Sequence, residues 1–381
     1  MRKFSHISLF SGAGGFDIGL EESGFETRVM VENDRNCHQT LHLNRRAASF
    51  RSEILGDITK LTPSDVLEQS GCTIGEINLL SGGPPCQSFS TAGKRLSIRD
   101  PRGSLFDNFV SMIDFMQPQF FLMENVRGLL SAAVDHRPLR LRGDGHPPLT
   151  KYEQLGSVFE LKIMPSFKKL GYQVIIGLLN SLDYGAAQDR KRLIILGSRD
   201  KEFPTDDIDE LLPPTHSKDG AAGTSPYVIL GDVIKDLEDC PGPYMEYSKE
   251  RKRIYKMIPP GKNWRYIRDS EKFTIEDLKN AMGGAYTSTG GRVGFWRRLS
   301  YDKWSPTVTT SPVQKATGLC HPTALRPLSI KEYARIQGFP DNWEFAGSIA
   351  SQYRQIGNAV PIPLGSAIGK LLRSVIQSSS R

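Results

Sequence analysis

The sequence predicts an α/β protein with a mostly parallel sheet and a second, smaller domain that is rich in loops. Two observations support this fold class. Short apolar runs alternate with helical patterns through the first 200 residues of the 381-residue chain, as is typical of parallel strands covered by helices. Beyond that point, prolines and paired glycines interrupt the pattern until a clear helix signal returns at Ser329.

The expected elements follow one another along the chain. Strands are predicted at residues 6–10, 27–32, 77–80, 120–123, 174–179 and 193–196, and helices at 14–23, 35–43 and 105–116. Ser329 and Glu332 have the spacing of a capping box, and a final apolar helix is expected near the C-terminus. The large domain should therefore combine residues 1–200 with 340–381, and residues 201–339 should form the smaller domain.

The composition is that of an ordinary globular protein, with 38% hydrophobic and 24% charged residues. No apolar run is long enough to span a bilayer, and the N-terminus lacks the apolar core of a signal peptide. The five cysteines are scattered and form no CxxC pair, so we expect neither disulfides nor a metal site. A reducing cytoplasm fits this pattern.

Charge is distributed unevenly along the second domain. Residues 201–250 contain 4 Lys or Arg and 12 Asp or Glu, whereas residues 251–325 contain 14 and 5. A strongly basic segment favours a surface that binds a polyanion such as nucleic acid. Two solvated faces of a single domain remain an equally good interpretation of charge alone.

A glycine-rich turn, SLFSGAGGFDIGLE, follows the first predicted strand and begins the first helix. Its glycines allow a ligand to approach the backbone and the helix N-terminus. Glu32 ends the next strand, where a carboxylate can bind both hydroxyls of a ribose. Asp17 occupies the position where a dinucleotide fingerprint has its third glycine, so the pattern favours another nucleoside ligand, although a simple tight turn is also open.

The segment GGPPCQSFS places Cys86 in a stiff loop just beyond a buried strand. Two prolines fix the backbone before the cysteine, and two glycines permit a sharp turn. A cysteine that only fills a core needs no such frame. Open α/β sheets bind ligands beyond the carboxyl ends of their strands, which makes Cys86 a candidate reactive group.

Two further segments contain candidate site residues. Glu124 ends an apolar strand, where burial should raise its pKa and allow it to donate a proton, although a plain ion pair with Arg127 is equally compatible with the segment. Arg190 and Arg192 stand two apart at the start of a later strand, so both guanidinium groups could face one cleft. Alternatively, the two arginines are ordinary charged residues at the start of a strand and have no role in a site.

These segments, in this order around the cysteine, resemble the DNA (cytosine-5)-methyltransferase family of bacterial restriction–modification systems. Further matching segments are GDIT, GSLF, RPLSIKEYARIQGFPDNW and QIGNAVPIPLG, and the resemblance covers almost the whole chain. It implies a Rossmann-like fold of S-adenosylmethionine-dependent methyltransferases, with a target-recognition domain between the QDRKR and RPLSIKE segments. Residues 131–155 look like an insertion to which we assign no role.

The resemblance also implies roles for individual residues. The catalytic group would contain the nucleophile Cys86, the acid Glu124, and the arginines Arg190 and Arg192. The cofactor pocket would contain Phe10, Ser11, Gly12, Gly14, Gly15, Glu32, Asp57, Ile58, Leu105 and Asn358. Candidate DNA contacts are Gln87, Ser90, Lys94 and Arg95 after the cysteine, and Arg292, Arg297 and Arg298 in the basic segment.

The implied reaction is transfer of a methyl group from S-adenosylmethionine to C5 of cytosine in a specific double-stranded DNA sequence, through a covalent bond between Cys86 and C6 of a flipped base. The expected protein is a bacterial, cytoplasmic, nucleoid-associated monomer with no membrane partner. The sequence leaves open whether a cognate restriction endonuclease acts separately. Three alternatives stay open: a tRNA methyltransferase of the same fold, a DNA-binding module without catalysis, and an NAD-dependent oxidoreductase.

Overall fold

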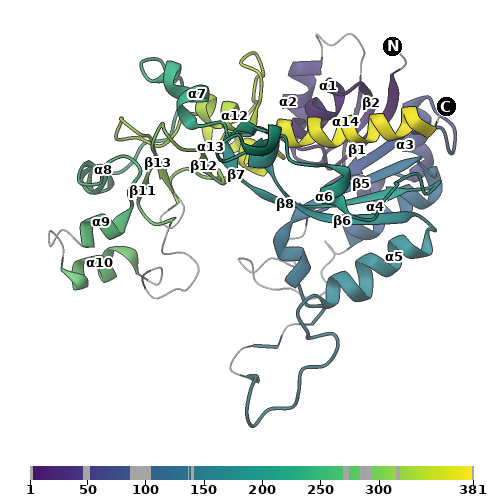
Figure 1. The fold of residues 1–381 in the computed structure, drawn as a ribbon, viewed down its shortest axis with the longest axis horizontal. Helices are drawn as coiled ribbons and strands as arrows, with labels where there is room; N and C mark the ends of the chain where they lie inside the picture. The colour runs from purple at the N-terminus through teal and green to yellow at the C-terminus, as the bar shows by residue number, and fades with distance from the viewer. Residues whose placement is uncertain are drawn as a thin grey trace.

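The computed structural model describes residues 3–45, 52–85, 104–135, 137–138, 141–268, 274–283, 286, 294–314 and 318–379. Within these ranges the main sheet has seven strands in the order β3-β2-β1-β4-β5-β8-β6 (Figure 1). Its strands are β1 (Phe4–Leu9), β2 (Phe25–Val31), β3 (Glu53–Leu55), β4 (Leu79–Gly82), β5 (Phe120–Val126), β6 (Gln173–Asn180) and β8 (Lys191–Ser198). The pairs from β3 to β5 are parallel, and β8 runs antiparallel to both of its neighbours. The predicted fold class is confirmed.

Helices cover both faces of this sheet. They include α1 (Gly15–Glu22), α2 (Arg35–Arg45), α3 (Pro63–Ser70), α4 (Ser104–Met116), α5 (Met164–Lys169) and α14 (Ile362–Ser379). Successive strand residues point to opposite faces. Leu80 and Phe121 accordingly belong to the hydrophobic cluster under α3, α4 and α5, whereas Leu79 and Phe120 belong to the cluster under α1 and α14. Burial on both faces explains why these strands are almost wholly apolar.

The C-terminal helix α14 packs closely against α1. A Cβ added at Gly19 would lie 2.5 Å from the carbonyl oxygen of Ile362, so only glycine allows the two backbones to approach this closely. The helical stretch Ile349–Ser379 is long and apolar enough to cross a membrane, but 61% of its most apolar window is buried inside the protein. That burial is typical of a core helix.

The basic segment forms a separate lobe with its own core. This small lobe contains α8 (Lys249–Lys256), α9 (Trp264–Arg268), α10 (Ile275–Met282), β11 (Arg297–Arg298) and β13 (Leu319–Cys320). Tyr255, Trp264 and Phe295 are at most 3% exposed in its hydrophobic cluster. Figure 1 shows this lobe beside the lobe that contains the main sheet.

A further hydrophobic cluster joins the two lobes. It includes α7 (Leu230–Ile234), α12 (Ile330–Gln337) and α13 (Ile349–Asn358), together with Ala13 of the glycine-rich turn. The predicted capping box at α12 is confirmed, because the Ser329 side chain accepts from the Glu332 amide and the Glu332 side chain accepts from the Ser329 amide. The domain limits near residues 200 and 340 stay predictions. α12 lies before residue 340 in the sequence and packs against α13, which lies after it.

The remaining elements are short. They are η1 (Ile58–Lys60), η3 (Arg127–Ser131), η5 (Phe159–Ile163), η6 (Ser181–Tyr184), β7 (Gln188–Asp189), α6 (Ile208–Leu211), β9 (His216–Ser217), η7 (Ala221–Gly223), β10 (Ser225–Pro226), η8 (Lys235–Leu237) and β12 (Ser305–Pro306). Between η3 and η5 the chain projects as a long loop (Figure 1). The base of this loop is held by a bond from the Asp135 amide to the Tyr152 carbonyl (2.9 Å) and by an ion pair between Arg137 and Glu153 (2.6 Å).

Candidate active site

The glycine-rich turn connects β1 to α1 and lies against Glu32. The Glu32 carboxylate accepts from the Gly12 amide (2.7 Å) and the Asp34 amide (2.6 Å), so it is fixed where β2 ends. Phe10 and Gly12 have φ angles of 59° and 57°, and a Cβ added at Gly12 would meet no atom within 4 Å. Burial raises the pKa of Glu32, and its bonds to these backbone amides oppose that effect. The turn therefore offers open space beside a fixed carboxylate.

The other two glycines of the turn face protein. A Cβ at Gly14 would lie 3.0 Å from a Leu41 methyl group, and one at Gly15 would lie 3.1 Å from the carbonyl oxygen of Val360. Gly15 thus allows the segment that follows α13 to lie directly against the turn. Asp17 is buried beneath them, and burial raises the pKa of its carboxyl to about 7.

The other predicted cofactor residues lie at the ends of neighbouring elements. Asp57 caps η1 by accepting from the amide and hydroxyl of Thr59, and these bonds lower its pKa. Ile58 is buried, and half-buried Leu105 packs on the same hydrophobic cluster as Phe10. Asn358 is exposed at the last position of α13. Ser11 donates to Ser8, which holds the turn onto β1.

The chain that leads to Cys86 begins between the glycine-rich turn and Glu124. β4 pairs with β1 on one side and with β5 on the other, with Gly82 opposite both Leu9 and Met123. A Cβ added at Gly83 would lie 3.1 Å from Oε2 of Glu124, so the loop passes directly against this carboxylate. A side chain at this position would require the Glu124 carboxylate to shift by a few tenths of an ångström.

Asn125 fixes this loop from the neighbouring strand. Its Nδ2 donates to the carbonyl oxygen of Pro84 (3.1 Å), and its Oδ1 accepts from the Val126 amide (2.9 Å). The side chain is 5% exposed, so water competes little for these bonds. Asn125 thus holds the backbone two residues before Cys86. The sequence analysis assigned Asn125 no role; the available signal was an amide directly after the strand-end acid.

Glu124 forms an ion pair with Arg192. The Glu124 Oε1 and Arg192 Nε atoms are 2.6 Å apart, and the side chains are 15% and 10% exposed. Burial raises the pKa of Glu124, while the charges of Arg192 and Arg190 oppose this effect. Glu124 pairs with Arg192 and not with Arg127, so the alternative ion pair is wrong. Arg192 therefore positions the carboxyl group and moderates its pKa.

Arg190 differs from Arg192 in its contacts. It is 2% exposed, and its two terminal nitrogens donate to the carbonyl oxygens of Val308 (3.0 Å) and Gly357 (2.7 Å). Arg190 is therefore bound to backbone carbonyl groups while its charge still acts on Glu124, and the expectation that both guanidinium groups face one cleft stays a prediction. Alternation along β8 could not reveal these carbonyl contacts, because Arg190 precedes the strand.

Arg190 belongs to a junction that also contains Gln188. β12 pairs with β7 beside it, and the Gln188 amide donates to Oε1 of Gln337 (2.6 Å) in α12. The Oε1 atom of Gln188 accepts from the Val308 amide (3.3 Å). Arg190 and Gln188 together fasten the small-lobe chain to the main sheet and to the segment before Asn358.

The predicted DNA contacts fall into two groups. Cys86, Gln87, Ser90, Lys94, Arg95 and Arg292 lie outside the described residues. In the small lobe, Arg297 lines a cavity of about 540 Å³, and burial lowers its pKa. Arg298 instead donates to four carbonyl oxygens, of Pro322 (2.9 Å), Ile258 (3.1 Å), Thr323 (2.7 Å) and Tyr255 (3.5 Å). These bonds occupy its guanidinium inside the lobe and argue against the predicted DNA contact.

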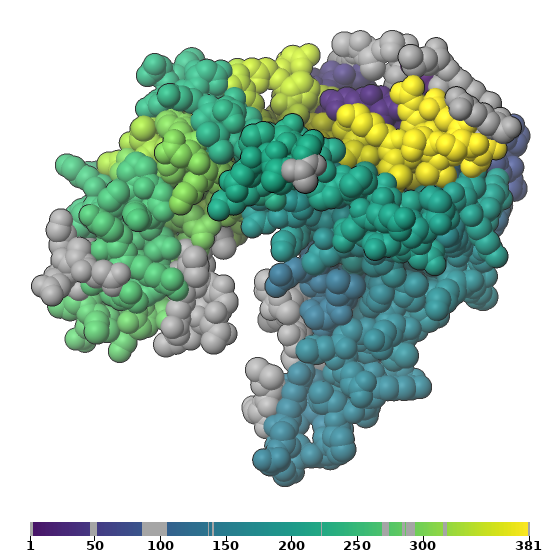
Figure 2. Space-filling view, in the orientation of Figure 1, coloured from purple at the N-terminus to yellow at the C-terminus, as the bar shows by residue number. Residues whose placement is uncertain are grey.

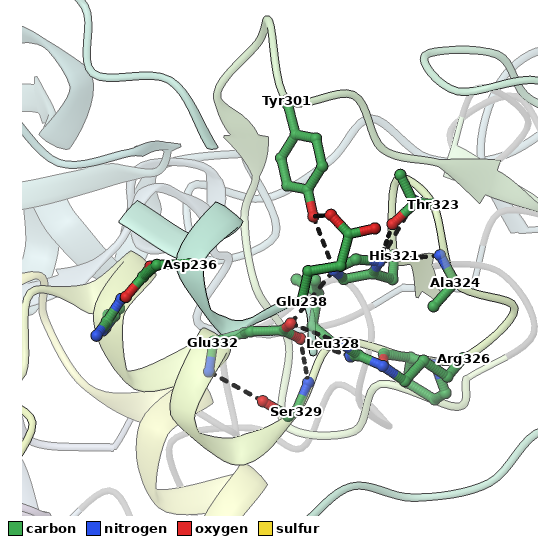
Figure 3. Close-up of polar contacts among 12 residues, drawn as sticks. Asp236, Glu238, Tyr301, His321, Thr323, Ala324, Arg326, Leu328, Ser329 and Glu332 are labelled. Carbon is green, nitrogen blue, oxygen red and sulfur yellow. Dashed lines mark hydrogen bonds and ion pairs between the residues drawn. The ribbon is translucent and has the colours of Figure 1, made fainter. Parts of the chain in front are cut away.

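A buried polar network surrounds Glu332 at the start of α12 (Figure 3). Glu332, which is fully buried, accepts two bonds from Arg326 (2.7 and 2.8 Å) and lies 3.3 Å from Nε2 of His321. Burial would raise the pKa of Glu332, but the bonds from Arg326 and His321 outweigh it and the pKa is lowered. Tyr301 extends the network to Glu238 (2.9 Å). The RPLSIKE segment thus has a structural role in holding the lobes together.

Comparison with known proteins agrees with this geometry. The family model for C-5 cytosine-specific DNA methylases matches residues 4–374. The chain is 38% identical over 373 residues to the type II methyltransferase M.Sau96I of Staphylococcus aureus, covering 97% of this chain and 76% of that protein. It is 35% identical to M.Eco47II of Escherichia coli, covering 96% and 78%.

A solved structure shows the same fold at lower identity. A mutant of Spodoptera frugiperda DNMT2 superimposes with a TM-score of 0.61 and 18% identity, covering 97% of this chain and all of that one. The chain belongs to the family of C-5 cytosine-specific DNA methylases.

Proposed function

We propose that this protein transfers the methyl group of S-adenosylmethionine to C5 of a cytosine within a specific double-stranded DNA sequence. The observation that carries the proposal is the position of the chain before Cys86. That chain starts between the glycine-rich turn and the Glu124–Arg192 pair, and Asn125 holds it there. Cofactor, nucleophile and acid would then meet at one edge of the sheet.

The residues around the turn fit S-adenosylmethionine. Gly12 leaves open space beside its backbone, and the Glu32 carboxylate lies within hydrogen-bond reach of that backbone, where it can accept from two ribose hydroxyls. Phe10, Ile58 and Leu105 supply apolar surface for an adenine ring, with Asp57 and Asn358 as polar contacts. The bound cofactor supplies an activated methyl group on a sulfonium centre.

Each catalytic side chain has a distinct task on the cytosine. The Cys86 thiolate adds to C6, and Glu124 protonates N3, so that the electron pair of the C5–C6 bond becomes available at C5. Attack of C5 on the methyl group would break the methyl–sulfonium bond and leave the cofactor as a neutral thioether. A base then removes the C5 proton, the C6–sulfur bond breaks, and N3 returns its proton to Glu124, which restores the ring, the thiolate and the acid. Arg192 keeps the Glu124 carboxyl pointing at the site through their ion pair.

The target base must leave the duplex to reach this site, because C5 and C6 are inaccessible to the cysteine inside the stack. Figure 2 shows a hollow between the sheet lobe and the small lobe. Residues of both lobes line a common cavity. A duplex held in this hollow would place the extruded nucleotide beside the strand ends of the main sheet.

The biological setting we propose is the modification half of a restriction–modification system in a bacterial cytoplasm. Support comes from the relatives, since M.Sau96I and M.Eco47II are both type II methyltransferases. The long basic segment, residues 251–325, favours duplex DNA over tRNA as the substrate.

The test is labelling of duplex DNA and of tRNA with methyl-labelled S-adenosylmethionine, followed by bisulfite sequencing of DNA from cells that express the chain. We expect label in duplex DNA and methylcytosine at one recurrent sequence. The Cys86→Ala variant should bind DNA but transfer nothing. Label confined to tRNA, or turnover by Cys86→Ala, would contradict the proposal.

A further inference from the structure

We propose that Arg127, Lys191 and Arg297 form a clamp for one DNA phosphate, with Arg127 and Lys191 supplied by the sheet lobe and Arg297 by the small lobe. This inference rests on the proposed function, because it names how the same enzyme would hold its DNA. Neither sequence reasoning nor the comparisons assign a role to Lys191, and Arg127 was considered only as a partner of Glu124.

The three side chains line one cavity of about 540 Å³ at the junction of the lobes. The lining also contains the carboxylate of Asp189 and the less polar residues Gly294, Pro306, Thr307, Thr309 and Leu319. Among the described lining residues, three cations stand beside one carboxylate, so positive charge is in excess there. A phosphate diester is the anion that a DNA-binding enzyme meets at this place.

Two of the cations flank the last pair of the β5–β8 ladder. That ladder ends with Val126 opposite Arg192, and the next residues are Arg127, which begins η3, and Lys191, which begins β8. Both line the same cavity, and no carboxylate within the described ranges forms an ion pair with either of them. An anion bound between them would offset their mutual repulsion.

Arg297 approaches from β11 on the other side of the cavity. β11 pairs with β13, which places Arg297 opposite Leu319, another lining residue. Burial lowers the pKa of Arg297, which indicates that its charge is held partly away from water. A cation in such a position interacts more strongly with an anion than a fully solvated one does.

A phosphate fits this arrangement better than a base edge does. A guanine edge is served by one bidentate arginine, whereas a phosphate has oxygens enough for several cations. The clamp would also draw the lobes together, because its members come from both. Asp189 cannot replace the phosphate, since its own Oδ1 accepts from Asn180 (3.1 Å) and it lies on the wall with Lys191.

The test measures the salt dependence of DNA binding for the full-length protein. The probe is a fluorescent duplex of arbitrary sequence, titrated by anisotropy at several salt concentrations. Each variant, Lys191→Gln and Arg297→Gln, should reduce the slope of log K against log salt by about 1 and weaken binding about tenfold, as expected for loss of one phosphate contact. The double variant should lose less than the sum, because both residues hold the same phosphate.

Lys169→Gln is the matched control, because Lys169 is exposed at the end of α5 and does not line the cavity. Its slope should equal that of the unchanged protein. Lys191 is exposed as well, so Lys191→Gln keeps the test valid even if Arg297→Gln does not fold.

Two results would overturn the clamp. One is an unchanged salt slope in both single variants. The other is a change in the methylated sequence of Arg297→Gln instead of a uniform loss of affinity, which would make Arg297 a reader of a base. The binding assay needs no methyl transfer, so failure of the clamp and failure of the proposed methyltransferase activity are separate outcomes.

Discussion

Replacing Arg190 tests whether this arginine is a structural cross-link between the lobes. In Arg190→Met, the carbonyl oxygens of Val308 and Gly357 lose their donors in a place where Arg190 itself is only 2% exposed. An unsatisfied buried acceptor costs about 1–3 kcal/mol, so two of them cost about 2–6 kcal/mol of unfolding free energy. The lower half of that range is expected, because the variant also removes a buried cation.

Urea denaturation monitored by tryptophan fluorescence measures this loss. Arg190→Lys keeps the charge and one donor group, so it should lose roughly half as much. Arg28→Met is the control, because Arg28 pairs with Glu26 at 3.4 Å and its side chain is 41% exposed. The control should lose less than about 1 kcal/mol. If Arg190→Met lost no more than the control, the cross-link would have no energetic role.

Further predictions concern the acid, the buried carboxyl group and the turn. Glu124→Gln should slow single-turnover methyl transfer strongly with little change in cofactor affinity. The methyl-transfer rate of the unchanged enzyme should fall as pH rises through the raised pKa of Glu124, because the acid loses its proton. The variant should not show this fall. The same fall of rate with pH in both proteins would exclude Glu124 as its source. Asp17 has a folded pKa of about 7 against an ordinary 3.8, so the folded state binds its proton more tightly and stability falls as pH rises between these values. Asp17→Asn should remove this dependence and stabilise the protein above pH 7 by up to about 4 kcal/mol, as measured by urea denaturation at several pH values; a parallel pH dependence in the variant would contradict the assignment. Gly15→Ala should cost about 1–3 kcal/mol, because its Cβ would lie 3.0 Å from the Phe339 ring and 3.1 Å from the carbonyl of Val360; a melting temperature equal to that of the unchanged protein would show that the neighbours can move.

Much of the fold could be predicted because burial on both faces makes these strands continuous apolar runs. The strands predicted at 120–123 and 193–196 lie inside β5 and β8, and the capping box at Ser329 begins α12 as expected. The three-residue strand β3 was missed, since only half-buried and exposed residues form it. The short helices of the small lobe were also missed, because their start signals are scattered among prolines and glycines.

The site could be predicted only where residue type and chain position decide the chemistry. Glu124 at a strand end is such a case, and its pKa is raised as expected. The roles of Arg190 and Arg298 depend on which carbonyl groups from distant segments lie nearby, and no local pattern contains that information. The bond from Asn125 to Pro84 was hidden for the same reason, since it joins residues 41 positions apart.

The central claim is that Cys86 bonds to C6 of a cytosine that has left the helix, and trapping that bond tests it most directly. Fluorine at C5 cannot be removed as a cation by a base, so a duplex containing 5-fluorocytosine at the methylated position should remain attached to the enzyme in the presence of S-adenosylmethionine. Mass spectrometry should find the DNA on the peptide that contains Cys86, and none on Cys86→Ser. Attachment at another residue, or methyl transfer to ordinary DNA with no trapped complex, would contradict the account.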